Sequence, residues 1–143
     1  MLRVQGVQAQ GGVPKREYVE VGHRGDMRSE IRIPIRPVSW NTLARKSRWT
    51  YKETFEAMKV QTMAAVMKTK PYPRFTGQVK VRFIAAWKDK RKHDLDNVCV
   101  KPILDELVSM KVLTGDDMDV MTEVVIRGNR SKEESLTVII ESI

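Results

Sequence analysis

The order of apolar and polar positions predicts strands in the first half of the chain. Residues 31–36 alternate apolar and polar side chains, which is the period of a half-buried strand. Pro34 lacks the backbone N–H that a sheet ladder needs, which favours an edge position for this strand or a place for Pro34 on its exposed side. The clearest strand covers residues 78–87. Its apolar face consists of Val79, Val81, Phe83 and Ala85.

Two segments have the spacing of amphipathic helices. Residues 50–68 form the longer one, and two prolines beyond it prevent its continuation. Its start is expected at Thr50, which with Glu53 matches a capping box. The second helix is predicted over residues 97–110, with Pro102 tolerated only near its start.

The remaining segments complete the fold. Residues 37–41 read as a loop, and residues 119–127 and 135–143 as a closing hairpin around Gly128-Asn129. The resulting order is β-α-β-α-β-β. It predicts an α/β (α+β) fold in which a single layer of mixed β-sheet is flanked by two helices.

The length of 143 residues fits one domain with a core of its own. We expect this domain to cover residues 29–143. Residues 1–28 lack periodicity and are expected to form a flexible N-terminal arm, in which residues 18–21 fit one short strand.

The charge balance makes a nucleic acid the first partner to consider. The net charge is +8 and the sequence pI is about 9.8. A basic protein that is merely soluble is the alternative interpretation. A single cysteine, Cys99, excludes an internal disulfide and a cysteine-rich zinc site. No apolar run approaches the roughly 20 residues of a membrane span, and no signal peptide is evident, so a cytoplasmic protein without a membrane partner is expected.

Three acidic residues stand out against this basic background. Asp94 and Asp96 lie in the sequence His-Asp-Leu-Asp-Asn, and Asp117 follows Gly115-Asp116. Residues two apart in an extended segment point to the same side, so one cation can meet both Asp94 and Asp96. A hard cation such as Mg²⁺ takes oxygen ligands and keeps several waters. The pattern predicts a divalent-metal site facing a polyanion, at the junction of a strand and a helix.

One lysine lies close to this acidic cluster. Lys101 shares a face with Asn97 if the helix has begun by Asn97, and it could then hold a phosphate or stabilise its developing charge. Asp105, one turn further, could pair with Lys101. The acidic clusters also have ordinary structural interpretations, because Asp96-Asn97 fits a helix N-cap and residues 115–117 fit a turn.

Basic residues gather in two patches near these motifs. The first patch consists of Lys88, Lys90, Arg91 and Lys92, and the second of Arg45, Lys46 and Arg48. Both are predicted to contact phosphates, although solvated turns would need no other explanation. Trp40 and Trp49 accompany the second patch and could stack on unpaired bases or pack in the core. His93 could assist proton transfer or be an ordinary surface residue.

Together these motifs resemble the RusA family of Holliday-junction resolvases. The family pattern is Pro-x-Ser-x-Asn, then Asp-x-Asp-Asn, a Lys with a Leu-Asp-x-Leu helix, and an Asp-Asp turn. It is matched in order by residues 37–41, 94–97, 101–107 and 116–117. The resemblance covers roughly residues 31–143. The interval from Asn97 to Lys101 is one residue longer than is usual for the family, which would turn Lys101 by about 100° on a continuous helix.

The resemblance implies a homodimer that cuts four-way DNA junctions with Mg²⁺ or Mn²⁺. It implies that the catalytic metal ligands are Asp94, Asp96 and Asp117, and that Lys101 is the essential basic residue. Asn41 and Asn97 join the two basic patches as expected DNA contacts.

The predicted function is therefore structure-selective, metal-dependent hydrolysis of DNA at Holliday junctions during recombination and repair. One alternative is a non-catalytic basic DNA-binding module, whose aspartates only cap and turn. Another is a small-phosphoester hydrolase, which usually places Asp-x-Asp directly at the end of an apolar strand, whereas residues 88–92 intervene here.

Overall fold

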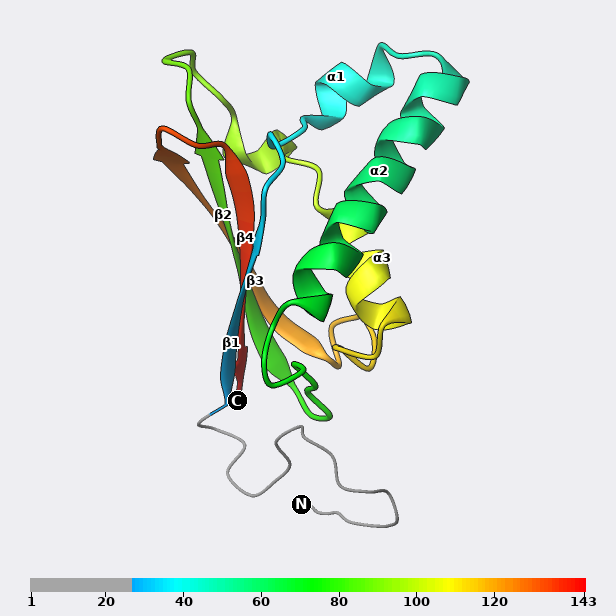
Figure 1. The fold of residues 1–143 in the computed structure, drawn as a ribbon, viewed down its shortest axis with the longest axis vertical. Coiled ribbons are helices and arrows are strands. Elements are labelled where there is room, and N and C mark those ends of the chain that lie inside the picture. Colours follow the sequence, from blue (N-terminus) through cyan, green and yellow to red (C-terminus); the bar gives the residue numbers. More distant parts are fainter. Residues whose placement is uncertain (1–26) are drawn as a thin grey trace.

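The computed structural model describes residues 27–143, which form one mixed β-sheet and the helices packed on it (Figure 1). The fold is α+β, as predicted, with a four-stranded sheet and three α-helices among the described residues. In chain order the elements are β1 (Arg28–Ile33), α1 (Trp40–Ala44), α2 (Arg48–Met67), β2 (Val79–Trp87), the 3-10 turn η2 (Leu95–Asn97), α3 (Lys101–Ser109), β3 (Met121–Arg130) and β4 (Ser135–Ser142). The strand predicted at residues 18–21 lies outside the described residues, as does most of the predicted arm.

β4 lies inside the sheet although it follows the other strands in the sequence. The strand order is β1-β4-β2-β3. β4 pairs antiparallel with β1 on one side and with β2 on the other, and β3 runs parallel to β2 at the far edge. Residues 135–140 are all buried except Thr137. This burial explains the position of β4, because a strand buried on both faces belongs inside a sheet.

The predicted hairpin between β3 and β4 is wrong, because β2 separates the two strands. Gly128 and Asn129 lie inside β3, opposite Ala85 and Ala86 of β2, and the chain turns only after β3 ends. Gly128 meets a packing requirement instead of a turn requirement. A Cβ atom there would lie 2.8 Å from Leu95 Cδ2, so the missing side chain lets η2 approach β3 closely.

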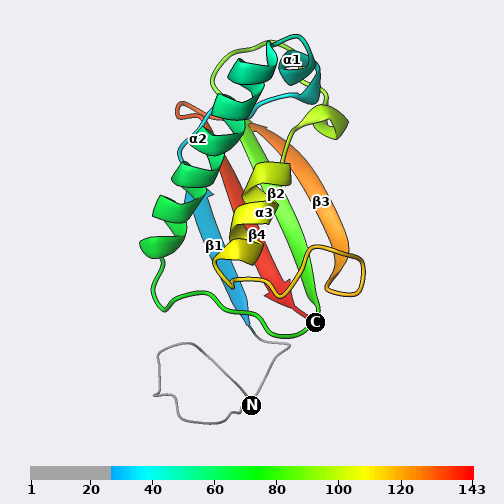
Figure 2. The same ribbon diagram turned by 90° about the vertical axis from the view of Figure 1, so that its right-hand side faces the viewer.

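α2 and α3 pack side by side on one face of the sheet, and the core lies beneath them (Figure 2). The apolar face predicted for β2 is confirmed, since all four of its residues are buried. Ile103 and Leu107 of α3 and Met58 and Val66 of α2 close the core from above. Each large apolar side chain buried in this way contributes about 1.5–3 kcal/mol, so this face supplies most of the fold's stability.

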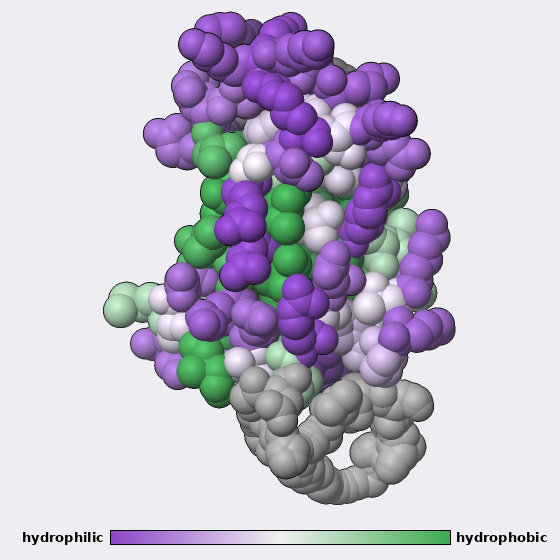
Figure 3. Space-filling view, turned by 90° about the vertical axis from the view of Figure 1, so that its left-hand side faces the viewer, coloured by the Kyte–Doolittle hydropathy of each residue, from purple (hydrophilic) through white to green (hydrophobic). Residues whose placement is uncertain are grey.

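Within residues 27–143, no helix covers the opposite face of the sheet. Arg28, Glu30 and Arg32 are the exposed residues of β1, and they alternate with the residues that face the core. Figure 3 shows this face, where hydrophilic side chains stand between apolar patches. β1 is an edge strand and ends directly before Pro34, which confirms the edge position predicted from this proline.

Two serines start the first two helices. Ser39 accepts a hydrogen bond from the Thr42 N–H at 3.0 Å, so α1 forms where a loop was predicted. Ser47 accepts a hydrogen bond from the Thr50 N–H at 3.1 Å, and α2 begins directly after Ser47. The predicted capping box of Thr50 with Glu53 is therefore wrong, since Thr50 already lies inside the helix.

α3 begins at Lys101, four residues later than predicted. η2 ends at Asn97, Val98 is extended, and the Cys99 N–H donates to the Val38 carbonyl at 2.7 Å. This bond holds the segment between η2 and α3 against the loop before α1. That segment is therefore not helical, and α3 can begin only after it. Asn97 and Lys101 therefore do not share a helix face.

Ser47→Ala is expected to lower the free energy of unfolding by about 1 kcal/mol, because caps of this type contribute roughly 0.5–2 kcal/mol. Glu53→Gln is the matched change at the rejected cap and should cost less than about 0.5 kcal/mol, as exposed substitutions usually do. Urea unfolding followed by circular dichroism measures both. A larger cost for Glu53→Gln than for Ser47→Ala would restore the capping box as the helix start.

Candidate functional site

Asp94 and Asp96 lie at η2, the turn that follows the loop after β2. Leu95 between them packs toward Gly128 of β3, and both aspartates are exposed. Asp94 occupies the N-cap position of the turn, but its side chain makes no capping hydrogen bond. Asp96 lies inside the turn, so it is not the helix N-cap that Asp96-Asn97 could have formed. Neither carboxylate pairs with another described residue, so both are available to a ligand.

A stacked pair of rings holds the loop that leads to Asp94. His93 lies flat on Trp87, with ring centroids 4.1 Å apart and 3° between the ring planes. The His93 Nε2 is 2.8 Å from Asp89 Oδ1, and the Arg91 backbone N–H donates to the same oxygen at 3.2 Å. His93 is thus an anchor of the loop, with its side chain only 16% exposed.

Arg36 connects this loop to other parts of the chain. Its guanidinium pairs with Asp89 Oδ2 at 3.0 Å and with Glu134, which precedes β4. Glu134 also accepts a hydrogen bond from the Lys88 N–H at 3.2 Å. Arg130, at the end of β3, donates to the Asp89 carbonyl at 2.8 Å. These contacts fix the course of the loop up to Asp94.

The same contacts set the charges of the loop. The hydrogen bond with His93 lowers the pKa of the Asp89 carboxyl far below its usual range, and the hydrogen bond with Arg36 acts in the same direction. The hydrogen bond with Asp89 raises the pKa of Arg36, to which the charge of Glu134 also contributes. The Arg36 guanidinium therefore stays protonated, and its two carboxylate partners balance its charge.

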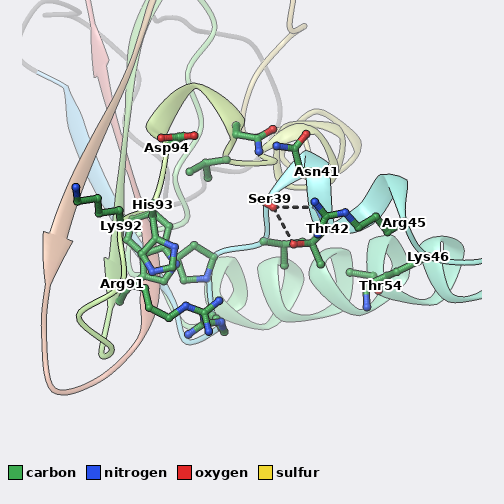
Figure 4. Close-up of a pocket in the computed structure, with 16 residues that line it drawn as sticks. Ser39, Asn41, Thr42, Arg45, Lys46, Thr54, Arg91, Lys92, His93 and Asp94 are labelled. Atoms are coloured by element: carbon green, nitrogen blue, oxygen red, sulfur yellow. Dashed lines mark hydrogen bonds between the residues drawn. The ribbon is translucent and has the colours of Figure 1, made fainter.

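A cleft of about 430 Å³ opens between this loop and the corner formed by α1 and α2 (Figure 4). Four of its lining residues are cations that make no ion pair with another described residue, and we call them the cleft cations. They are Arg45 and Lys46 on the helical side and Arg91 and Lys92 on the loop. Asp94 alone is acidic among the described residues that line the cleft. The positive cleft therefore contains one of the three predicted metal ligands, Asp94.

The structure divides the predicted DNA contacts into two groups. The cleft brings together Arg45, Lys46, Arg91, Lys92, Asn41 and Asn97. Outside its lining, but exposed, are Lys88, Lys90 and Arg48. Trp40 packs against Phe55 with ring centroids 6.0 Å apart, whereas Trp49 is 69% exposed.

Lys101 is held by acidic neighbours at the start of α3. Its Nζ lies 2.9 Å from Asp105 Oδ1 and 4.0 Å from Asp116 Oδ2. The hydrogen bond with Asp105 raises the pKa of the Lys101 ammonium, which stays protonated. The pairing of Lys101 with Asp105, considered from the sequence, is present.

Within one protomer the structure does not bring Asp117 to Asp94 and Asp96. The Asp117 Oδ1 accepts a hydrogen bond from the Asp119 N–H at 2.8 Å, which closes the turn before β3. η2 packs instead beside Gly128, far along β3. The strand from residue 121 to residue 128 spans about 23 Å at roughly 3.3 Å per residue. Figure 2 shows η2 and the loop between α3 and β3 toward opposite ends of β3.

A cation held by Asp94 and Asp96 stays a prediction, because the two residues lie at a 3-10 turn and not in the extended segment expected, and only Asp94 lines the cleft. Mg²⁺ is commonly bound through one or two carboxylates, with waters and substrate phosphates completing its coordination. Within residues 27–143, no three His, Cys, Asp or Glu side chains converge on a metal position. The role of Asp117 as a metal ligand therefore stays a prediction that one protomer does not explain.

Sequence reasoning missed the residues that position the loop. Arg36 and Glu134 are 98 positions apart, and no local pattern signals such a pairing. Asp89 and His93 are four apart, but that spacing predicts contact only on a helix, and here they lie in a loop.

No family model matches the chain, and neither does any curated protein. The resemblance to junction resolvases therefore rests on the motifs quoted above. In the part of the chain that the structure describes, no helix is long and apolar enough to cross a membrane.

Asp89→Asn is expected to lower the melting temperature at neutral pH, because His93 and Arg36 stabilise the ionised carboxylate. A carboxyl whose pKa is depressed on folding stabilises the fold above its ordinary pKa, here 3.8, and loses this contribution as the pH falls below that value. The gap between wild type and variant should therefore stay nearly constant from neutral pH to about 4 and shrink progressively as the pH falls below about 4.

Thermal unfolding followed by circular dichroism at several pH values measures this gap. Asp119→Asn is the control, since the Asp119 carboxylate has no ion pair with a described residue. A gap for Asp89→Asn that stays constant across the pH range would show that the ionised carboxylate does not stabilise the loop.

Proposed function

We propose that this chain is a divalent-metal-dependent endodeoxyribonuclease that resolves four-way DNA junctions. One observation carries the proposal: Asp94 and Asp96, carboxylates without a partner among residues 27–143, lie on one turn, and Asp94 lines a cleft together with the four cleft cations. Carboxylates bind hard cations and the neighbouring cations bind phosphates, so the combination suits hydrolysis of a nucleic-acid backbone. The resemblance of the motifs to junction resolvases supports the four-way junction as the substrate, and recombination and repair as the process.

Asp94 and Asp96 would hold Mg²⁺ or Mn²⁺. Such an ion, when bound, activates water for attack on phosphorus and offsets charge on the phosphate oxygens. The chain's own residues position the substrate. Arg45 and Arg91, from opposite sides of the cleft, would grip backbone phosphates, and Asp94 follows Arg91 on the same loop. A strand held in this way passes the acidic turn.

Lys101 would act through its charge. Asp105 keeps the ammonium protonated, and the Lys101 side chain is 56% exposed at the first position of α3. A cation at this place favours a phosphate near η2 and the negative charge that develops on it.

Asp117 enters the proposal through a homodimer. Metal ligands lie about 2.1 Å from Mg²⁺, and the length of β3 separates Asp117 from Asp94 and Asp96 within one protomer. Asp117 would therefore serve the acidic turn of the other protomer. Two sites related by a two-fold axis would allow paired nicks across a symmetric junction.

A non-catalytic DNA-binding module is the second candidate. The hydrogen bond from the Asp119 N–H to the Asp117 carboxylate favours this candidate. A structural role in the turn is enough to explain an aspartate at position 117. Such a module would bind junctions without nicking them. A cytoplasmic location is part of the proposal for either candidate.

Asp94→Asn and Asp96→Asn are each expected to abolish Mg²⁺-dependent cleavage of a synthetic four-way junction while retaining junction binding. The loss should exceed the roughly 10–100-fold that removal of an outer-sphere partner costs at a metal site. Asp119→Asn, an acid outside the site, should cleave like wild type. Linear duplex and a small phosphoester, assayed beside the junction, separate the rival activities. Full cleavage by both variants would remove the metal site from this turn.

A mixture of Asp94→Asn and Asp117→Asn protomers, made by co-expression, tests whether the site is shared. If each Asp117 serves the other protomer, mixed dimers carry one intact site. Random assembly then restores about a quarter of wild-type cleavage, although each variant alone is inactive. If the folded mixture stays inactive, or if sedimentation shows a monomer, Asp117 is not a shared ligand. If Asp117→Asn alone is fully active, Asp117 is not a metal ligand and has only a structural role in the turn before β3.

A further inference from the structure

The cleft has the size of one nucleotide. Its volume of about 430 Å³ lies within the roughly 300–1,000 Å³ that is typical of small-ligand pockets. One sugar, base and phosphate unit is a ligand of this class.

The charge inside the cleft matches a phosphodiester backbone. The cleft cations lie on both of its sides and make no ion pair with another described residue (Figure 4). Arg36 also lines the cleft, but Asp89 and Glu134 neutralise it. Arg36 thus anchors the loop through its two ion pairs, whereas the cleft cations are available to bind a phosphate. Arginine in particular grips phosphate oxygens through two parallel hydrogen bonds.

The same cleft offers surfaces suited to a base. His93 contributes its ring to the lining, with its side chain 16% exposed, whereas the Trp87 ring beneath it is buried. The side chains of Asn41 and Asn97 also line the cleft. Unpaired bases stack on aromatic and histidine rings, and amides offer both a donor and an acceptor to a base edge. In a duplex the faces of each base are covered by its neighbours, so only an unpaired base can use such a ring surface.

The loop side of the cleft is in place before a ligand arrives. The contacts of Arg36 with Asp89 and Glu134, and of His93 with Trp87, already fix its course. Binding to a pre-organised wall avoids the entropy cost of ordering a loop.

We propose that the cleft binds one unpaired deoxynucleotide of the substrate strand, with backbone phosphates on the cleft cations and the base against the His93 ring, which Trp87 supports from beneath. The inference rests on the proposed nuclease function for its place beside Asp94. It means that the strand is unpaired where it approaches the acidic turn. Selectivity would then come from exposed single-stranded character at a branch point as well as from the shape of the junction.

Binding in EDTA tests this inference without metal and without cleavage. Fluorescence anisotropy compares three labelled ligands on the full chain: an oligothymidylate, an abasic oligomer of equal length, and a fully paired hairpin of the same strand length. Oligothymidylate should bind at least about fivefold more tightly than either of the others, the lower end of what one stacked base contributes.

Variants of the cleft cations test the phosphate contacts separately. Arg45→Gln and Arg91→Gln should each flatten the plot of log affinity against log salt for oligothymidylate by about 0.7, the value for one lost contact to a single strand. Arg32→Gln is the control, since Arg32 lies on the uncovered sheet face and pairs with Glu133. It should leave the slope unchanged.

Equal affinity for oligothymidylate and the abasic oligomer, or for oligothymidylate and the hairpin, would overturn the inference. Salt slopes that stay unchanged in both cleft variants would also overturn it. The comparison of ligands uses the wild-type chain, so it decides the matter even if a variant fails to fold. A chain that binds oligothymidylate as expected but never cleaves a junction would count against the nuclease function and not against this cleft.

Discussion

The pairing of Arg36 with two carboxylates is the interaction on which the candidate site depends. Arg36 follows β1, Asp89 follows β2, and Glu134 precedes β4, so one guanidinium joins three segments at one end of the sheet. An isolated exposed ion pair contributes little to stability. Here the cation is shared, and one of its carboxylates also holds a histidine stacked on Trp87. The two ion pairs of Arg36 and the contacts of His93 act together, and together they hold the loop before Asp94 in one conformation.

This anchoring also explains the distribution of charge around the cleft. The charge of Arg36 is balanced by its partners, whereas Asp94 is the one carboxylate among the described residues that line the cleft with the cleft cations. Positive charge is thus concentrated where a strand would lie, and negative charge where a cation would bind. Low-dielectric walls strengthen both effects, because charges in a cleft are screened less than charges on an open surface.

The parts of the fold that depend on local patterns could be predicted from the sequence. The alternation in β2 placed that strand within one residue of its observed start. The extended segment expected around Asp94 and Asp96 is instead a 3-10 turn. The start of α2 was wrong because Ser47 and Thr50 both precede good helix formers, and only the backbone decides which hydroxyl caps.

Long-range features could not be predicted. The insertion of β4 between β1 and β2 depends on burial along the whole sheet, and the hairpin prediction failed for this reason. The position of Asp117 depends on the direction of β3. A strand parallel to β2 begins at the end of the sheet opposite to the one at which β2 stops, so the two acidic turns diverge. The partners of Arg36 are equally distant in sequence.

The central position of β4 has a consequence for biosynthesis. β1 is hydrogen-bonded within the sheet through β4, and β4 leaves the ribosome after β1, β2 and β3 have been made. Until the last strand is made, β1 therefore lacks its only hydrogen-bonding partner in the described sheet. Such delayed, non-local pairing leaves apolar strand edges open to other chains. Newly made copies would thus depend on chaperones more than the small size of the domain suggests.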